Sequence, residues 1–242
     1  INKSSINRSL IHNIRSIAPA PNNFNIKVEN SKIEVENHNI ITISVNLNKL
    51  TFGDGFARLK FKDEVFVLND SNNYLGMTKI ITNSKDIVSK AKELLEALII
   101  DGTKQDSIPN GFKAIIPSNT KIKSLTYDNK VIKVDFSSDL MNTIPENEEK
   151  IIEAIVYTLT NIEDVEFVII YMEGELLTTL PQSKITLPST LDRNFGINKE
   201  YNLNSTKDIN KTTIYYISEF NGNEYYVPVT KVTNDERSKI EI

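Results

Sequence analysis

The strongest constraint on the fold of this 242-residue chain is an internal repeat. Residues 65–83 read VFVLNDSNNYLGMTKIITN, and residues 214–234 read IYYISEFNGNEYYVPVTKVTN. Each segment has a strand pattern, a polar turn, a second strand led by an aromatic residue, and a closing Thr-Asn (residues 82–83 and 233–234). Self-similarity at an offset of about 150 residues predicts tandem structural units rather than one fold built once.

The repeat divides the chain into four predicted parts. A full unit spans residues 62–190, residues 191–210 form a connector, and residues 211–242 begin a further unit. Residues 1–61 are a strand-rich partial unit, because the apolar order around residues 24–47 resembles that of 112–136. Each end alone would expose an apolar strand edge, so we hypothesise that strands in 26–47 and 214–229 pair, within one chain or head to tail between chains.

Two helices are predicted from apolar stripes with helical spacing. The first runs from an N-cap at Ser84 to Ile100, and the second from Pro145 to Asn161, with acidic residues in its first turn. Residues 10–17 are predicted to form a shorter helix. The stripes consist of Ile87, Val88, Ala91, Leu94, Leu95 and Leu98 in the first helix and Ile151, Ile152, Ile155 and Leu159 in the second.

Strand patterns surround these helices. Residues 122–126 and 132–136 predict a hairpin across Asp128-Asn129, and 64–68 with 74–82 and 214–218 with 225–229 predict two more. Residues 165–172 are nearly all apolar, which predicts a strand buried on both faces. The expected fold class is therefore α+β, with both helices on one face of a small mixed sheet of three or four strands.

Composition excludes several kinds of chemistry. The chain has no cysteine, only two histidines and a net charge of −4, so we expect no thiolate or histidine metal site, no bound cofactor and no nucleic-acid partner. No catalytic motif is present, so we expect no enzymatic activity. The longest apolar run, residues 168–172, is too short to cross a membrane.

Three polar segments resemble functional sites, but each has a structural interpretation that we favour. Residues 69–73 look like a calcium loop, but Leu75 and Ile81 occupy the positions where an EF-hand needs glycine and a carboxylate, so a hairpin turn is favoured. Asp135 near Ser137 reads as a strand end rather than a reactive pair. The acidic residues Glu146, Glu148 and Glu149 read as the first turn of a helix rather than a docking patch.

Aromatic residues are concentrated on the last two predicted strands. Tyr215, Tyr216, Tyr225 and Tyr226 favour cross-strand packing, and a platform for stacking a carbohydrate is the alternative. They are the residues we predict for an interaction site.

A set of short blocks resembles a known family. Between residues 62 and 190 the chain is similar to the GerM domain, although Asp101-Gly102 stands where that family usually has Gly-Pro. The blocks are Leu94-Leu95 with Leu98, Ile116-Pro117 with Thr120, Val134-Asp135-Phe136-Ser137, Ala154 to Thr160, Val165 with Val168, and Gly174. Residues 191–201 are similar to the connector of tandem GerM domains, and residues 211–242 to the opening of a second one.

The resemblance implies a fold and a role. GerM domains are small α+β units related to ring-building motifs, found in lipoproteins of sporulation and germination that support a channel complex between mother cell and forespore. It thus implies an extracytoplasmic, non-enzymatic, tandem interaction module of Firmicutes, held to a membrane by a lipid or signal segment outside this sequence. Its partners would be other sporulation envelope proteins or further copies in a ring or filament. The alternative is an accessory module that binds peptidoglycan.

Overall fold

The chain divides into two units, residues 1–61 and 62–242. The computed structural model describes the backbone of the strands in 25–46 and of Phe61, and residues 62–69, 74–205 and 207–234 in full. In the first unit, β1 (Asn25–Glu29) and β2 (Lys32–Glu36) are antiparallel, and β3 (Val45–Asn46) pairs with β2. The helix predicted at 10–17 lies outside the described residues.

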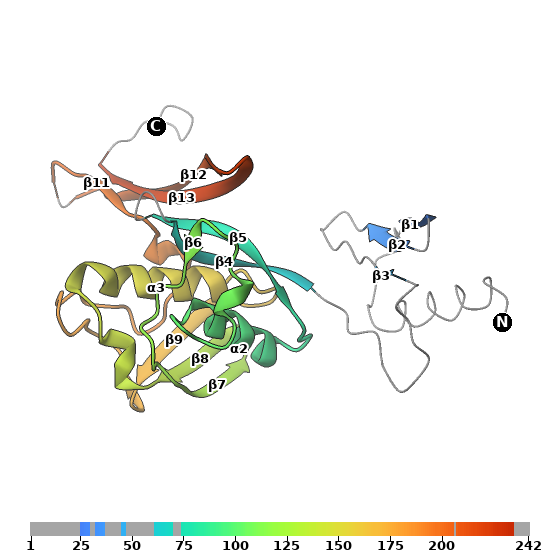
Figure 1. Ribbon diagram of the computed structural model, residues 1–242. Coiled ribbons are helices and arrows are strands. Elements are labelled where there is room, and N and C mark those ends of the chain that lie inside the picture. Colours follow the sequence, from blue (N-terminus) through green and yellow to red (C-terminus); the bar gives the residue numbers. More distant parts are fainter. Residues whose placement is uncertain are drawn as a thin grey trace. The chain divides into compact units, whose positions relative to one another are not determined.

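Among its described residues, the second unit contains two sheets and two α-helices, which Figure 1 shows in their arrangement. One sheet has four strands in the order β10-β9-β8-β7: β7 is Ile122–Asp128, β8 Val131–Phe136, β9 Phe167–Met172 and β10 Glu175–Leu176. The predicted hairpin β7–β8 is confirmed. Strands β8 and β9 are parallel, because the helix α3 (Pro145–Leu159) crosses between them.

The other sheet has six strands and joins two hairpins that are far apart in sequence. These are β4 (Phe61–Asn69) with β5 (Leu75–Thr82), and β12 (Asn210–Phe220) with β13 (Asn223–Thr233). Tyr226 of β13 pairs with Met77 of β5, and the short strands β6 (Phe112–Lys113) and β11 (Glu200–Asn202) lie beside β4 and β13. We call β12 and β13 the ribbon.

The helices begin where local chemistry favours it. Helix α2 (Ile87–Leu98) is capped by Asp86, whose carboxylate accepts the N–H of Ser89 at 2.8 Å; the predicted cap, Ser84, instead donates its hydroxyl to Glu93. Helix α3 starts at its predicted proline. Three short 3-10 helices complete the unit: η2 (Gln105–Ser107), η3 (Ser138–Met141) and η4 (Arg193–Phe195).

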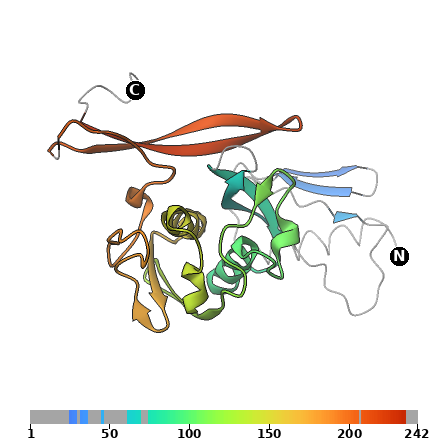
Figure 2. The same ribbon diagram turned by 60° about the vertical axis from the view of Figure 1, so that its left-hand side comes forward.

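The core surrounds α3 on all sides. Every residue from 151 to 159 is buried, and Figure 2 shows α3 almost end-on with strands of the two sheets on either side. The N–H of Phe66 in β4 donates to the hydroxyl of Thr158 at 3.1 Å, so β4 is tied to the helix directly. The second half of α3 is therefore enclosed on every side, and its buried polar groups, such as the Thr158 hydroxyl, need partners in the surrounding elements.

The α+β class, with two helices and a small mixed sheet of four strands, is confirmed. The prediction did not include the second sheet, in which β4, β5 and β6 join the ribbon on the other side of α3. One prediction about packing needs correction. Strand β9 buries Val168 and Ile170 while its other residues keep partial exposure, so it is not buried on both faces.

Strands β1, β2 and β3 form one sheet, and β12 and β13 belong to the six-stranded sheet. The pairing expected between strands in 26–47 and 214–229 stays a prediction.

Candidate interaction surface

The connector fastens the ribbon to α3, beginning at Arg193. Its guanidinium lies 5.0 Å from the ring centroid of Tyr157 and donates to the side-chain oxygen of Asn161 at 2.8 Å. The hydroxyl of Tyr157 donates in return to the Arg193 carbonyl at 3.0 Å. Arg193 also reaches the hydroxyl of Tyr215 in β12 at 3.4 Å, so one side chain contacts both α3 and the ribbon.

Asn198 joins β5 to β13. Its side chain accepts the N–H of Leu75 at 2.8 Å and donates to the carbonyls of Leu75 at 2.8 Å and Pro228 at 2.7 Å. Its own N–H donates to Glu153 at 2.9 Å. The residue is buried with a φ of 48°, a conformation that asparagine tolerates better than most residues. We call this arrangement, with Lys199, the junction.

A buried ion pair completes the junction. The ammonium of Lys199 lies 2.6 Å from Glu149 and 3.2 Å from Glu153, both on α3, and 3.6 Å from the ring centroid of Phe195. Burial raises the pKa of Glu153 to about 7, against the opposing effects of Lys199 and the Asn198 N–H. A buried carboxylate with these partners holds the connector in one position on the helix.

The four predicted tyrosines do not form one platform. In the ribbon register Tyr215 lies opposite Pro228 and Ile217 opposite Tyr226, so Tyr215 and Tyr226 share one face and Tyr216 lies on the other. Tyr225 is half-buried.

Tyr225 packs against other parts of the second unit rather than forming part of an exposed surface. Its ring packs edge-on against Phe112 with centroids 4.8 Å apart, and its hydroxyl accepts from Asn69 at 3.0 Å and from Ser218 at 3.1 Å.

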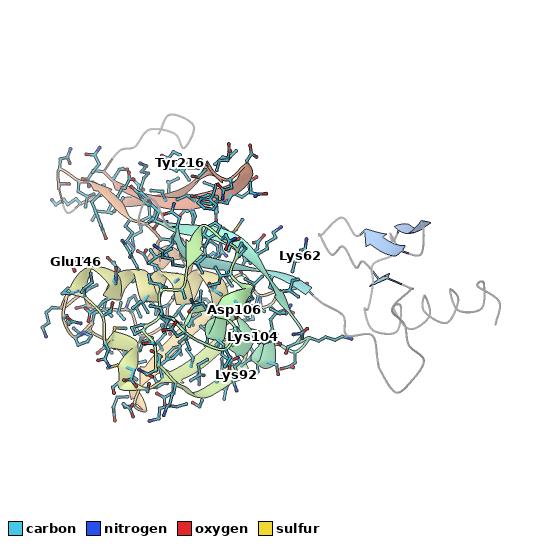
Figure 3. All side chains as sticks on the ribbon, in the orientation of Figure 1. Lys62, Lys92, Lys104, Asp106, Glu146 and Tyr216 are labelled. Carbon is cyan, nitrogen blue, oxygen red and sulfur yellow. The ribbon has the colours of Figure 1, made fainter. Side chains whose placement is uncertain are left out.

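The ribbon and connector carry most of the exposed large apolar side chains of the described residues: Tyr201, Leu203, Ile209, Tyr215, Tyr216, Ile217 and Tyr226. Three of them, Tyr215, Ile217 and Tyr226, are neighbours on one face, and Ile217 is 65% exposed. We call these three the ribbon patch. Figure 3, where Tyr216 marks the ribbon, shows the side chains along it. A cluster of exposed apolar side chains is typical of a contact surface.

The acidic residues of α3 form no docking patch. Glu148 is fully buried and its carboxylate accepts the N–H groups of Gln182 at 3.0 Å and Ser183 at 2.7 Å. Glu149 pairs with the connector, and Glu146 is exposed. The structural interpretation of this run is therefore confirmed, although Glu148 anchors a loop rather than facing solvent.

Asp135 and Ser137 are likewise structural. Asp135 accepts the N–H of Gly174 at 3.0 Å, and the Ser137 hydroxyl donates to Asp139 at 3.0 Å. The turn at residues 70–73 lies outside the described residues. Within 62–69, 74–205 and 207–234, no group of acidic or histidine side chains has metal-binding geometry. No described helix is long and apolar enough to cross a membrane.

The junction is not among the sites predicted from the sequence. The signal in the sequence is weak: Glu153 is the one charged residue between positions 151 and 159, and Asn198 lies two residues after a glycine in the connector. The sequence around either residue does not identify its partner, because that partner lies far away in the chain.

Comparisons with known proteins agree with this architecture. Residues 64–178 match the family model described as Germane, sporulation and spore germination. The spore germination protein GerM of Bacillus subtilis is 30% identical over 179 residues, which is 73% of this chain and 48% of the relative. The chain thus spans about half the length of that curated relative.

A solved structure adds a match in three dimensions. The tandem GerMN domains of the sporulation protein GerM from Bacillus subtilis superpose with a TM-score of 0.68 at 29% identity. The match covers 75% of this chain and 64% of that one.

Proposed function

The chain belongs to the Germane family of sporulation and spore germination proteins through its domain at residues 64–178, and from this we propose that it is a non-enzymatic assembly module acting outside the cytoplasm. Its partners would be other proteins of the spore envelope, contacted in building a channel or ring complex. It would reach the membrane through an anchor outside this sequence.

The observation that carries the proposal is the ribbon patch beside the junction. The junction orders the connector through buried bonds to α3, so the patch is presented on a preorganised support. Tyr215, Ile217 and Tyr226 offer two aromatic rings and a branched apolar side chain at the exposed end of that support. Aromatic residues of this kind are enriched in protein interfaces.

We further propose that residues 211–242 open a second domain. The ribbon repeats the hairpin β4–β5 in sequence, and the two hairpins meet through their second strands at Tyr226 and Met77. The similar solved structure is described as tandem GerMN domains, which supports this interpretation.

The experiment is complementation in a spore-forming host from which the gene for its own protein of this family has been deleted. Ile217→Asn should lower the yield of heat-resistant spores, because it places an amide in the centre of the patch. The matched control is Ile144→Asn, since Ile144 is also exposed, at 58%, but lies at the start of α3. A folded Ile217→Asn protein that supports wild-type spore yield would refute the role of the patch.

Peptidoglycan binding is the second candidate. It is favoured by one observation: the rings of Tyr215 and Tyr226 are exposed on the same face, where a sugar could stack. Co-sedimentation with purified peptidoglycan tests it, with Tyr226→Ser expected to abolish retention. Absence of retention in the unaltered chain removes this candidate and leaves the assembly role in place.

A further inference from the structure

The outer edge of β12 has no partner strand among the described residues. Strand β13 is flanked on one side by β5 and β11 and on the other by β12, whereas β12 pairs with β13 alone. Figure 1 shows β12 on the side of β13 that faces away from α3. The edge is eleven residues long, which is well above the usual length of a strand left uncovered.

The turn of the ribbon determines which backbone groups point outward. Asn221 and Gly222 have φ values of 50° and 79°, as in a two-residue hairpin turn, so Phe220 and Asn223 exchange hydrogen bonds and the pairing alternates from there. The N–H and C=O groups of odd-numbered residues of β12 therefore point away from β13.

Pro228 provides an independent check on this alternation. It lies opposite Tyr215 and has no N–H to give to β12, so it suits only a position that exchanges no bonds with Tyr215. Its carbonyl accordingly points the other way and accepts from Asn198 at 2.7 Å. The outward groups of β12 are those of Lys211, Thr213, Tyr215, Ile217 and Glu219.

The centre of the β12 edge lacks proline and charged residues, the features that usually prevent an edge strand from pairing with another chain. Residues 212–218 contain no proline and no charge, and the two charged residues at outward positions, Lys211 and Glu219, lie four residues from Tyr215 on either side. In the repeated hairpin, the N–H of Phe66, which aligns with Tyr215, is taken by the Thr158 hydroxyl of α3. The N–H of Tyr215 has no such acceptor among the described residues.

We propose that the outer edge of β12 pairs with β12 of a second copy of this chain, antiparallel and centred on Tyr215. This register places Lys211 of each copy opposite Glu219 of the other and Thr213 opposite Ile217. All five outward residues then find a partner, giving about ten hydrogen bonds between the chains. The contact is self-complementary, so it closes as a two-fold dimer and does not propagate.

The two charges select this register over its neighbours. A shift by two residues in either direction removes the opposition of Lys211 and Glu219, and a parallel arrangement in register places like charges side by side. Opposite charges across two strands are stabilising and like charges are destabilising. Lys211 is free to swing outward at little cost, since its exposed ammonium group makes one bond, to the Asn194 carbonyl at 3.2 Å.

Sedimentation of the full 242-residue chain over a concentration series tests the pairing. The unaltered chain should dimerise, Lys211→Glu or Glu219→Lys alone should weaken dimerisation about tenfold or more, and the double exchange should restore it. Lys207→Glu is the matched control, because Lys207 is exposed and lies before β12. Far-UV circular dichroism checks that each variant keeps its strands.

Two results would overturn the pairing. One is a chain that stays monomeric at every concentration, as expected if another segment takes up the outward groups of β12 as Thr158 takes up the N–H of Phe66. The other is a dimer whose affinity is unchanged by Lys211→Glu and by Glu219→Lys. Either result leaves the proposed assembly role intact, because that role is tested by spore yield and the effect of Ile217→Asn.

Discussion

Asn198→Asp is the substitution that tests the junction most directly. The two side chains have the same shape and both tolerate a positive φ, so backbone strain does not enter. The carboxylate still accepts the N–H of Leu75, but it replaces the amide group that donates to the carbonyls of Leu75 and Pro228. The buried carbonyl oxygens of Leu75 and Pro228 then lie at hydrogen-bond distance from a carboxylate oxygen, which has no proton to donate.

The magnitude follows from those two bonds. Each buried carbonyl left without its donor costs about 1–3 kcal/mol, and burying the new charge adds to this, so we expect a loss of roughly 3–5 kcal/mol at neutral pH. For a unit of this size that corresponds to a melting temperature lower by roughly 10 °C.

The sign of the pH dependence provides an internal control. Burial beside two carbonyls raises the pKa of the introduced carboxyl group, so its destabilising effect develops as pH rises from its unfolded value through its folded one. Below that range the protonated group can donate to one carbonyl again, and part of the stability returns. Asn202→Asp, four residues along and exposed, should lose little at any pH.

Urea unfolding followed by tyrosine fluorescence measures the effect, because the chain has nine tyrosines and no tryptophan. The reasoning is wrong if the free energy of unfolding of Asn198→Asp lies within about 1 kcal/mol of that of the unaltered chain at neutral pH. It is also wrong if the loss is the same in acid as at neutral pH.

Substitutions at three further positions test the core and the ion pair. Because burial raises the pKa of Glu153 to about 7 from 4.5, its contribution to stability is largest below the unfolded value and declines as pH rises through 7, by up to about 3 kcal/mol. Glu153→Gln should make the urea midpoint depend less on pH between about pH 5 and pH 8. An unchanged pH dependence would contradict the assignment of the raised pKa to Glu153. Thr158→Val should cost about 1–3 kcal/mol by leaving the buried N–H of Phe66 without an acceptor, whereas Thr158→Ser should cost less; equal losses would argue against that bond. Leu95→Asp should unfold the unit, since Leu95 is fully buried on α2, and a variant with native circular dichroism and a wild-type melting temperature would refute the packing.

Local elements were predictable because their causes are local. The alternation of residues 132–136 and the proline at the start of α3 depend on neighbours within one turn or one hairpin, and both predictions are confirmed. The cap of α2 was misplaced by two residues, since Ser84 and Asp86 are both good caps and only the bond to Ser89 distinguishes them.

The layering was harder to predict. The apolar stripe predicted for α3 leaves out Ala154, Val156 and Thr158, which implies that only one face of the helix is covered. In the fold those residues are buried as well, because a second sheet packs on their side. Whether small or hydroxyl-bearing residues face solvent or a neighbouring layer depends on strands distant in sequence, and helical periodicity contains no information about them.

The junction was beyond local reasoning for the same cause. Asn198 and Leu75 are separated by 123 residues, and nothing near Asn198 identifies that partner. The aromatic concentration on the ribbon was visible in sequence, but its division between two faces required the register of β12 against β13.

That separation also has a consequence for synthesis. At roughly 5–20 residues per second, the ribosome takes roughly 6–25 s to make the chain between Leu75 and Asn198. During that interval the growing chain contains β5 without the amide that occupies its edge in the finished fold. We therefore expect nascent chains to be most prone to aggregation and to chaperone binding in this interval, and least so once the connector has emerged.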